Sequence, residues 1–425
     1  MTLPTGFTEM LHSLLKEEAP LLIEALQQPP VTSVRLNSRK PGATFSDGIP
    51  VKWCANGFYL PKRPVFTLDP LLHAGAYYVQ DASSMIHREV ISRLVSHPIT
   101  LLDLCAAPGG KTTAMIDGLP DGSRVVANEY MPKRAAILKE NLTKWGYPLA
   151  TVTNRDSSFF ARSGDKFDIV AVDAPCSGEG MMRKDEDAVA QWSPQLIEQC
   201  ATLQKEIVTN AEKTLKPGGY LIYSTCTFNR TENEEVAEYI HKSLGLIPVD
   251  MDFPGEWGIP RGIDTDLPVY RFMPHRTEGE GLFLAVFRKP AEETPTDTNL
   301  PDSPQAFPAK SDHKKDFAKK GANLALKSPN VKNARRKGDS KPNDADLPEI
   351  EEILSVDFDR SKYPEADIDL STALSYLRRE AIRLSPDIPK GPVVITYKGL
   401  PLGMAKNIGT RANNLYPKSW RILMR

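Results

Sequence analysis

The 425-residue sequence lacks any apolar run close to the roughly 18 residues that a bilayer-spanning helix needs. Its first residues, Met1-Thr2-Leu3-Pro4, contain neither a basic stretch nor an apolar core, so we expect no secretory signal peptide. It has only five cysteines, an odd number for a chain of this length, which favours free thiols in a reducing compartment over a disulfide framework. We therefore expect a cytoplasmic protein.

Metal-ligand patterns and an excess of charge are also missing. No residues have Cys-x-x-Cys or His-x-x-x-His spacing, so we expect no metal site. The 53 Lys and Arg residues nearly balance the 54 Asp and Glu residues, and the net charge of −1 does not by itself indicate nucleic-acid binding. The hydrophobic content of 40% is ordinary for a globular protein, and the length predicts two or three domains.

Residues 1–75 predict a small N-terminal α+β module. Apolar residues first recur at helical spacing, and a second short helix, from Leu21 to Gln27, ends before two prolines. Residues Val31 to Leu36 alternate as a strand, and short β-like pieces with Pro and Gly follow as far as Tyr59.

Strands and helices alternate in the second predicted domain, residues 76–290. Five apolar stretches have strand length: 101–104, 124–128, 150–154, 169–172 and 220–223. Helical stretches are expected at 133–145 and 194–215, and a late apolar strand at 281–288. This order predicts an α/β fold with a doubly wound, mostly parallel sheet of the Rossmann type.

Residues 291–345 have a different composition. Pro, Thr, Asp and Ser dominate at first, and Lys310 to Lys341 contains 11 Lys or Arg against 3 Asp or Glu. We predict a charged flexible linker, because such a segment cannot form an apolar core. Its basic run is either a solvated tether or a non-specific contact with RNA phosphates.

Residues 346–425 are predicted to form another globular domain. The pattern predicts a helix over Ala373–Leu384 and a hairpin of Val393–Tyr397 with Leu402–Ala405. A basic end rich in amides and aromatic rings follows: Lys406, Asn407, Arg411, Asn413, Asn414, Tyr416, Lys418, Trp420 and Arg421. Such residues suit phosphate contacts and base stacking, although an ordinary polar surface has the same composition.

The segment from Leu101 to Lys111 has the sequence Leu-Leu-Asp-Leu-Cys-Ala-Ala-Pro-Gly-Gly-Lys. It joins a short strand, through a turn with two glycines, to a predicted helix at Thr112–Leu119. Backbone N–H groups at such a helix N-terminus face a bound ligand, and glycine allows the ligand to approach closely. The segment therefore predicts a cofactor site, and a turn that binds nothing is the alternative.

Two acidic residues extend this predicted cofactor site. Glu129 follows the second strand, about 20 residues after the glycines, where a carboxylate accepts hydrogen bonds from both ribose hydroxyls of an adenosine. Asp156 follows the third strand, where a carboxylate can accept a hydrogen bond from the adenine amino group. Together they predict an adenosine pocket, which suits a dinucleotide as well as S-adenosylmethionine (SAM).

Cysteines follow the fourth and fifth strands, in the segments Ala-Pro-Cys176 and Ser-Thr-Cys226. These strands are neighbours in a doubly wound sheet, so we expect both thiols to converge beside the cofactor. Packing explains a single buried cysteine and is our preferred interpretation of Cys54, Cys105 and Cys200. It explains a pair at adjacent strand ends poorly.

Two thiols and a carboxylate suit the methylation of a pyrimidine at C5. This carbon is a poor nucleophile until a thiolate adds to C6, which makes the ring enamine-like and lets C5 attack an electrophilic methyl group. An acid must protonate N3 as the adduct forms, and a base must remove the C5 proton before the enzyme is released.

Three motifs in this order resemble the Sun-type RNA cytosine-C5 methyltransferase family: Asp-Leu-Cys-Ala-Ala-Pro-Gly-Gly-Lys, Asp-Ala-Pro-Cys-Ser-Gly-Glu-Gly and Tyr-Ser-Thr-Cys-Thr-Phe-Asn-Arg-Thr-Glu-Asn-Glu. The resemblance covers residues 76–288. It implies Cys226 as the nucleophile, Cys176 as the residue that assists elimination and release, and Asp173 as the residue that acts at N3. It implies SAM as the cofactor, held by Cys105, Ala106, Ala107, Pro108, Gly109, Gly110, Lys111, Glu129, Asp156 and Asp173.

The C-terminal segments 397–403 and 413–417 resemble the PUA-like RNA-binding tail of RsmF-type bacterial 16S rRNA methyltransferases. The resemblance implies RNA-binding modules at both ends and a flipped cytosine of 16S rRNA, in free RNA or in the small ribosomal subunit, as the target. We expect the protein to be a monomer that binds no membrane and needs no protein partner. Three alternatives stay open: a tRNA substrate, a nicotinamide-dependent oxidoreductase and a non-catalytic RNA-binding assembly factor.

Four basic residues near these motifs are further candidates. Arg183 and Lys184 follow the Cys176 segment, where they can hold a target phosphate or belong to the solvated surface. His275 and Arg276 precede a glycine-rich segment, where they can line the path of the RNA or have a structural role.

Overall fold

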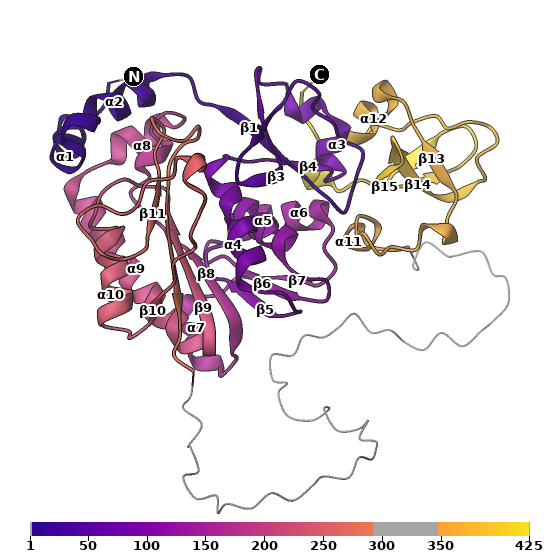
Figure 1. The fold of residues 1–425 in the computed structure, drawn as a ribbon. Helices are drawn as coiled ribbons and strands as arrows, with labels where there is room; N and C mark the ends of the chain where they lie inside the picture. The colour runs from indigo at the N-terminus through magenta and orange to yellow at the C-terminus, as the bar shows by residue number, and fades with distance from the viewer. Residues whose placement is uncertain (1, 292–346, 425) are drawn as a thin grey trace, which may run out of the picture. The chain divides into compact units, whose positions relative to one another are not determined.

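The computed structural model describes residues 2–291 and 347–424, so the basic run from Lys310 to Lys341 lies outside the described residues. Three sheets organise the described part of the chain, each with its own helices (Figure 1). In the described ranges no helix is both long enough and apolar enough to span a membrane.

The N-terminal part begins with two helices and continues into a four-stranded antiparallel sheet of order β2-β3-β1-β4. The bounds of its elements are α1 Thr5–Leu15, α2 Ala19–Gln27, β1 Thr32–Leu36, β2 Ile49–Val51, β3 Cys54–Leu60, α3 Pro70–His73 and β4 Tyr77–Val79. The two helices and the strand at 32–36 confirm the elements that the sequence predicts there.

Apolar residues of α1 and α2 form a core with a distant segment of the chain. Phe7 and Leu11 of α1 are completely buried, and they belong to the same cluster as Met182, Trp192 and Phe228. The spacing of four between Phe7 and Leu11 places both side chains on one helix face. This face covers the outside of the segments that follow the fourth and fifth strands of the central sheet.

The buried side chain of Arg35 joins the N-terminal sheet to the central domain. Its guanidinium donates to Oγ1 of Thr113 at 2.6 Å and pairs with the buried carboxylate of Asp117. It also lies 4.5 Å from the centroid of the Trp145 ring, within the range of a cation–π contact. Removing one partner of such a buried ion pair costs about 3–5 kcal/mol because the other charge stays buried and unpaired, so loss of either residue would destabilise the attachment of the sheet.

The central sheet has the strand order β10-β12-β9-β8-β5-β6-β7, with β11 paired to β12. Its strands are β5 Thr100–Asp103, β6 Arg124–Asn128, β7 Ala150–Thr153, β8 Phe167–Asp173, β9 Leu215–Thr225, β10 Ile247–Pro248, β11 Tyr270–Phe272 and β12 Leu282–Arg288. The five neighbouring strands β9, β8, β5, β6 and β7 are parallel, and β12 is antiparallel to β9. The predicted doubly wound α/β fold is therefore confirmed.

Helices cover both faces of this sheet (Figure 1). Leu101 belongs to the apolar cluster that contains residues of α4, α5 and α6, whereas its neighbour Leu102 belongs to the cluster that contains residues of α7, α9 and α10. Successive strand residues point to opposite faces, so a strand covered on both sides needs an unbroken apolar run. The helices are α4 Ile86–Leu94, α5 Gly110–Gly118, α6 Pro132–Trp145, α7 Ser157–Ser163, α8 Glu186–Gln191, α9 Pro194–Thr214 and α10 Glu234–Lys242.

The C-terminal part contains a four-stranded sheet of order β13-β14-β15-β16. Its elements are α11 Ile350–Ile353, β13 Glu365–Asp367, α12 Leu370–Leu377, β14 Gly391–Tyr397, β15 Leu400–Asn407 and β16 Ala412–Asn414. The predicted hairpin is confirmed, but the predicted helical end at Leu384 is wrong. The helix ends at Leu377 because Arg379 adopts the left-handed φ of 68°, after which the backbone of Ile382 pairs with Ala412.

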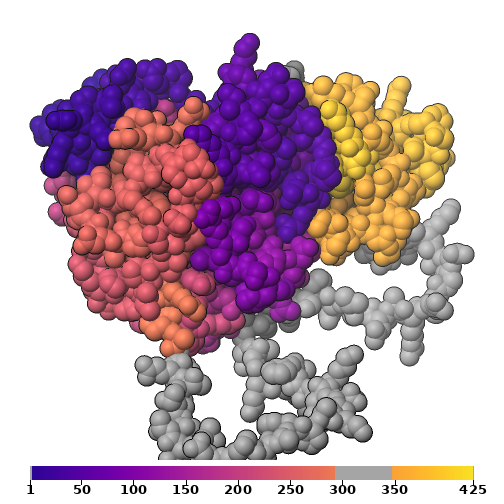
Figure 2. Space-filling model, viewed as in Figure 1, coloured from indigo at the N-terminus to yellow at the C-terminus, as the bar shows by residue number. Residues whose placement is uncertain are grey.

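The N-terminal helices lie against the segment between β11 and β12, as the indigo and orange surfaces in Figure 2 show. Glu18, directly before α2, accepts hydrogen bonds from His275 at 3.1 Å and from Arg276 Nε at 3.1 Å. Two segments separated by more than half of the sequence are thereby joined.

Candidate active site

The predicted cofactor turn connects the end of β5 to the first turn of α5. Gly109 has a left-handed φ of 111°, and a Cβ atom added to it would lie 3.3 Å from Cδ1 of Leu138. The N–H of Ala106 donates to the carbonyl of Asn128 at 2.8 Å, which holds the turn beside the end of β6. The turn is therefore a fixed backbone cradle at the N-terminus of α5, as a bound anionic or polar group requires.

Asp103, which is not among the predicted site residues, lies at the base of this cradle. Its Oδ2 accepts a hydrogen bond from Thr112 at 2.7 Å, whereas its buried Oδ1 has no hydrogen-bond partner among the described residues. Burial raises the pKa of Asp103 to about 7. An unpartnered buried oxygen and a glycine cradle both fit a site that receives hydrogen-bond donors from a bound cofactor.

The two acidic residues predicted for the adenosine differ in their surroundings. Glu129 is buried at the end of β6, where it accepts a hydrogen bond from the N–H of Met131 at 2.8 Å and lies 3.4 Å from Arg134. Asp156 is exposed and caps α7, and its hydrogen bonds with Ser158 lower the pKa of its carboxyl. Glu129 lies directly after β6, as predicted, and the contacts of both residues with an adenosine stay predictions.

The structure brings Cys176 and Cys226 together. Asp173 is the last residue of β8 and pairs in register with Ser224 of the neighbouring strand β9, so both thiols follow adjacent strand ends. The two Sγ atoms are 3.3 Å apart, within hydrogen-bond distance for sulfur. Both residues are half-buried in the loops beyond the sheet.

The pKa values of the two thiols are shifted in opposite directions. The hydrogen bond from Cys176 and the positive charge of Lys111 lower the pKa of Cys226, against the effect of burial. The same hydrogen bond and burial raise the pKa of Cys176 well above its usual value. Cys226 is therefore the more acidic thiol of the pair, and Cys176 is the one that holds its proton more tightly.

Asp173 is held by two side chains that come from different strands and loops. The ammonium group of Lys111 donates to Oδ2 at 2.8 Å, and the hydroxyl of Ser224 donates to Oδ1 at 2.9 Å. Lys111 was predicted as part of the SAM loop, which stays a prediction, and its side chain reaches the carboxylate of Asp173. Ser224 also lies 3.3 Å from Nε2 of buried His87, whose pKa is lowered to about 4 by burial, so that His87 is neutral.

The four basic candidates near the motifs are all paired with carboxylates. Arg183 is buried and pairs with Glu280 at 2.8 Å, and His275 and Arg276 are paired with Glu18. Lys184 pairs with the same Glu280 at 3.0 Å, whereas the guanidinium of Arg276 is half exposed, so its place along the RNA path stays a prediction. The interpretation of Arg183 as a phosphate ligand is wrong, because its guanidinium already pairs with the carboxylate of Glu280, 97 positions later in the chain.

Two other predicted roles can be compared with the structure. Tyr416 was predicted to suit base stacking, but its ring is buried and packs 5.6 Å from that of Tyr376, so that prediction is wrong. Cys54 is buried, as packing requires, and burial raises the pKa of Cys200 to about 12. Burial likewise raises the pKa of Cys105, so these three cysteines remain thiols.

Comparison with known families matches three parts of the chain. Residues 95–288 match 16S rRNA methyltransferase RsmB/F, residues 3–82 match the N-terminal domain of 16S rRNA methyltransferase RsmF, and residues 363–422 match the methyltransferase RsmF PUA domain. The ribosomal RNA small subunit methyltransferase F of Enterobacter sp. (strain 638) is 31% identical, over 93% of this chain and 91% of its own length. The chain belongs to the ribosomal RNA small subunit methyltransferase F family.

Other relatives agree with this membership in the methyltransferase F family. The protein of the same name from Erwinia tasmaniensis is 29% identical over 98% of this chain and 96% of its own. Among solved structures, a methyltransferase homolog from Pyrococcus horikoshii is 25% identical with a TM-score of 0.57, and covers 67% of this chain and 94% of its own. The NSun6 structure from the same organism, with SFG, has the same fold, with a TM-score of 0.59 at 20% identity.

Family and fold together confirm three predictions from the sequence. The chain is a methyltransferase with a Rossmann-like core, its cofactor is SAM, and a PUA-like domain follows the core. The oxidoreductase alternative is excluded by this membership. The residues that would hold SAM are those of the turn between β5 and α5, with Glu129 at the end of β6.

Proposed function

We propose that this protein methylates C5 of a cytosine in 16S rRNA through a covalent bond between Cys226 and C6. The single observation that carries the proposal is the 3.3 Å contact between Cys176 and Cys226 beside the carboxylate of Asp173. The family's named members act on the RNA of the small ribosomal subunit, which supports 16S rRNA as the substrate.

The chemistry assigns a separate role to each residue. The Cys226 thiolate adds to C6, the ring gains electron density, and Asp173, in its protonated form, supplies the proton that N3 takes up. SAM, when bound, supplies the electrophilic methyl group that C5 attacks. A base then takes the C5 proton, Asp173 takes back the N3 proton, and the C5–C6 double bond re-forms as Cys226 leaves as a thiolate.

The Cys176 thiol supports this last step. Its proton already forms a hydrogen bond with Cys226, and its raised pKa keeps that proton in place at neutral pH. A donor in this position stabilises the negative charge that returns to sulfur when the C6 bond breaks. The loss of Cys176 is therefore expected to slow release more than formation of the adduct.

We further propose how the remaining parts contribute. Residues 76–290 form the catalytic domain, residues 1–75 and 346–425 contact RNA, and residues 291–345 connect the two halves. Exposed Arg411, Lys418 and Arg421 support a phosphate-contacting surface on the C-terminal domain. Five free cysteines support a reducing, cytoplasmic location for a protein that acts as a monomer.

The test uses Cys176→Ser protein incubated with SAM and total cellular RNA, followed by a denaturing gel. We expect a slow band whose RNA maps to one cytosine of 16S rRNA. The Cys226→Ser protein should give no band and no methyl transfer, while its affinity for SAM stays that of the parent. Cys200→Ser is the matched control and should behave as the parent.

The other outcomes decide between the alternatives. A band that contains tRNA would keep the mechanism and overturn the 16S substrate. Methyl transfer by the Cys226→Ser protein would overturn the covalent mechanism. A blank result with both free RNA and small ribosomal subunits, together with no methyl transfer by the parent, would favour the non-catalytic assembly factor.

A further inference from the structure

Two buried carboxylates lie between the loops that carry the cysteines. We call residues 174–182 the Cys176 loop and residues 226–233 the Cys226 loop. Glu179 belongs to the first loop and Glu232 to the second, and both side chains are fully buried. Neither residue touches the sulfur atoms, so the chemistry described above does not use them.

Glu179 accepts four hydrogen bonds, three of them from the opposite loop. Its Oε2 accepts the backbone N–H groups of Phe228 at 2.6 Å and Asn229 at 2.9 Å. Its Oε1 accepts the side-chain amide of Asn229 at 3.1 Å and the indole N–H of Trp192 at 3.0 Å. A residue of the Cys176 loop thus fixes the backbone just after Cys226.

Glu232 makes the reciprocal set of contacts. Its Oε2 accepts the backbone N–H of Ser177 at 3.0 Å and the amide of Gln204 at 2.7 Å. Its Oε1 accepts the hydroxyl of Ser177 and the side-chain amide of Asn229 at 2.8 Å. A residue of the Cys226 loop thus fixes the backbone directly after Cys176.

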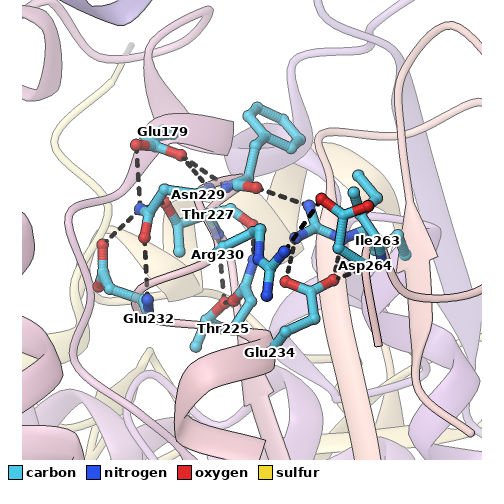
Figure 3. Close-up of polar contacts among 12 residues, drawn as sticks. Glu179, Thr225, Thr227, Asn229, Arg230, Glu232, Glu234, Ile263 and Asp264 are labelled. Carbon is cyan, nitrogen blue, oxygen red and sulfur yellow. Dashed lines mark hydrogen bonds and ion pairs between the residues drawn. The ribbon is translucent and has the colours of Figure 1, made fainter. Parts of the chain in front are cut away.

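The Asn229 amide lies between Glu179 and Glu232 and donates to both, as Figure 3 shows. Eight N–H and O–H bonds therefore converge on two carboxylates. A buried charge is costly unless hydrogen bonds satisfy it, and here each oxygen accepts two. Seven of the eight bonds come from N–H groups, which can only donate, so the four carboxylate oxygens act as acceptors.

We propose that Glu179 and Glu232 are positioning residues that hold the two loops at the separation where the thiols of Cys176 and Cys226 meet. The connection is short on both sides: Ser177 follows Cys176 directly, and Phe228 is two residues after Cys226. The N–H of Gly180 also donates to the carbonyl of Cys226 at 2.8 Å, which shows how closely the loops approach. The effect on methyl transfer rests on the proposed function, whereas the effect on the thiols does not.

Substitution by glutamine tests this role without changing the size of the side chain. Glutamine has the shape of glutamate, but its NH₂ group would face two donors, so each variant loses two acceptor bonds and gains repulsion. A displacement of about 1 Å at a reacting group costs about 100-fold in rate. We therefore expect Glu179→Gln and Glu232→Gln to lower methyl transfer about 100-fold while the affinity for SAM is unchanged.

The decisive measurement is the pH profile of Cys226 alkylation by iodoacetamide, mapped by peptide mass and made without RNA. The hydrogen bond from Cys176 lowers the pKa of Cys226, so separating the loops must move the profile to higher pH. The negative charge of Glu232 alone raises that pKa, so a purely electrostatic role predicts a shift to lower pH in Glu232→Gln. The direction of the shift therefore distinguishes the two roles.

Asp168→Asn is the matched control. Asp168 also accepts hydrogen bonds from a backbone N–H and two side chains, Thr100 and Lys216, but it lies at the opposite end of β8 from Asp173. This variant should lose stability without a change in the alkylation profile. Should either glutamine variant fail to fold, Asn229→Ala removes the amide that both carboxylates share and should shift the profile in the same direction by less.

An unchanged profile in folded Glu179→Gln protein, or a shift to lower pH in Glu232→Gln, would overturn the positioning role. The failure of the proposed function is distinguishable from this result. If the parent methylates no cytosine but the alkylation profiles still shift to higher pH, the positioning role stands and the proposed reaction does not.

Discussion

The ammonium nitrogen of Lys111 lies 2.8 Å from Oδ2 of Asp173, at the point where the cofactor turn meets the ends of β8 and β9. The same positive charge lowers the pKa of Cys226. One lysine therefore connects three groups of the site: the turn that it belongs to, the carboxylate and the nucleophilic thiol.

Replacing Lys111 by methionine should raise the pKa of Cys226. The thiolate fraction below the pKa falls about tenfold for each unit of increase, so iodoacetamide alkylation and methyl transfer should both need a higher pH. Rates measured across a pH series test this expectation. Lys166 is an exposed lysine at the far end of β8, so Lys166→Met is the control and should match the parent. If the Lys111→Met profile is also identical to the parent's, Lys111 does not activate the thiol.

Replacing Gly109 by alanine should weaken SAM binding. The left-handed φ of 111° costs a non-glycine residue about 1–2 kcal/mol, and the added Cβ presses on Leu138 inside the cradle. Gly164 has a φ of 82° with open space around it, so Gly164→Ala should lose similar stability but no affinity. Calorimetric titration with SAM separates the two, and equal affinities would argue against the cradle as the cofactor site.

The folded protein should lose stability in acid partly through His73. Burial lowers the pKa of His73 to about 4 from its ordinary 6.5. Between these values the imidazole binds a proton in the unfolded chain but not in the folded chain. The free energy of unfolding therefore falls by about 1.4 kcal/mol for each unit by which the pH falls. His73→Gln should remove this dependence.

Urea unfolding of both proteins across this window measures the effect. The stability lost by the substitution should be largest above pH 6.5 and shrink toward about pH 4. His12→Gln, at an exposed position of α1, serves as the comparison and should run parallel to the parent. A constant difference between the His73→Gln protein and the parent would contradict a neutral buried imidazole.

The sequence predicts the sheet well because its signals are local. Leu101 and Leu102 belong to an apolar run that only a strand covered on both faces requires, and the order of strands and helices determines which strand ends are adjacent. The meeting of Cys176 and Cys226 follows from that order. The helix after Ala373 was predicted too long because nothing in the local pattern indicates that Arg379 turns into the left-handed region.

Contacts between distant side chains were not predictable in the same way. Arg183 looks like a free cation beside a catalytic motif, and only the fold reveals that Glu280 neutralises it. The acidic residues of the motifs, Glu179 and Glu232, likewise resemble solvated charges in the sequence. Their burial depends on donors from both loops, among them the side-chain amide of Asn229, which donates to both carboxylates (Figure 3).

The packing of Phe7 and Leu11 against Met182, Trp192 and Phe228 has a consequence for any dissection of the chain. A fragment that starts at residue 76 would keep every motif of the reaction, yet it would uncover the apolar outer side of the loops that carry the cysteines. The unit that folds is therefore larger than the unit that sequence motifs outline. The first two helices cover the loops that carry the cysteines and are not a detachable appendage.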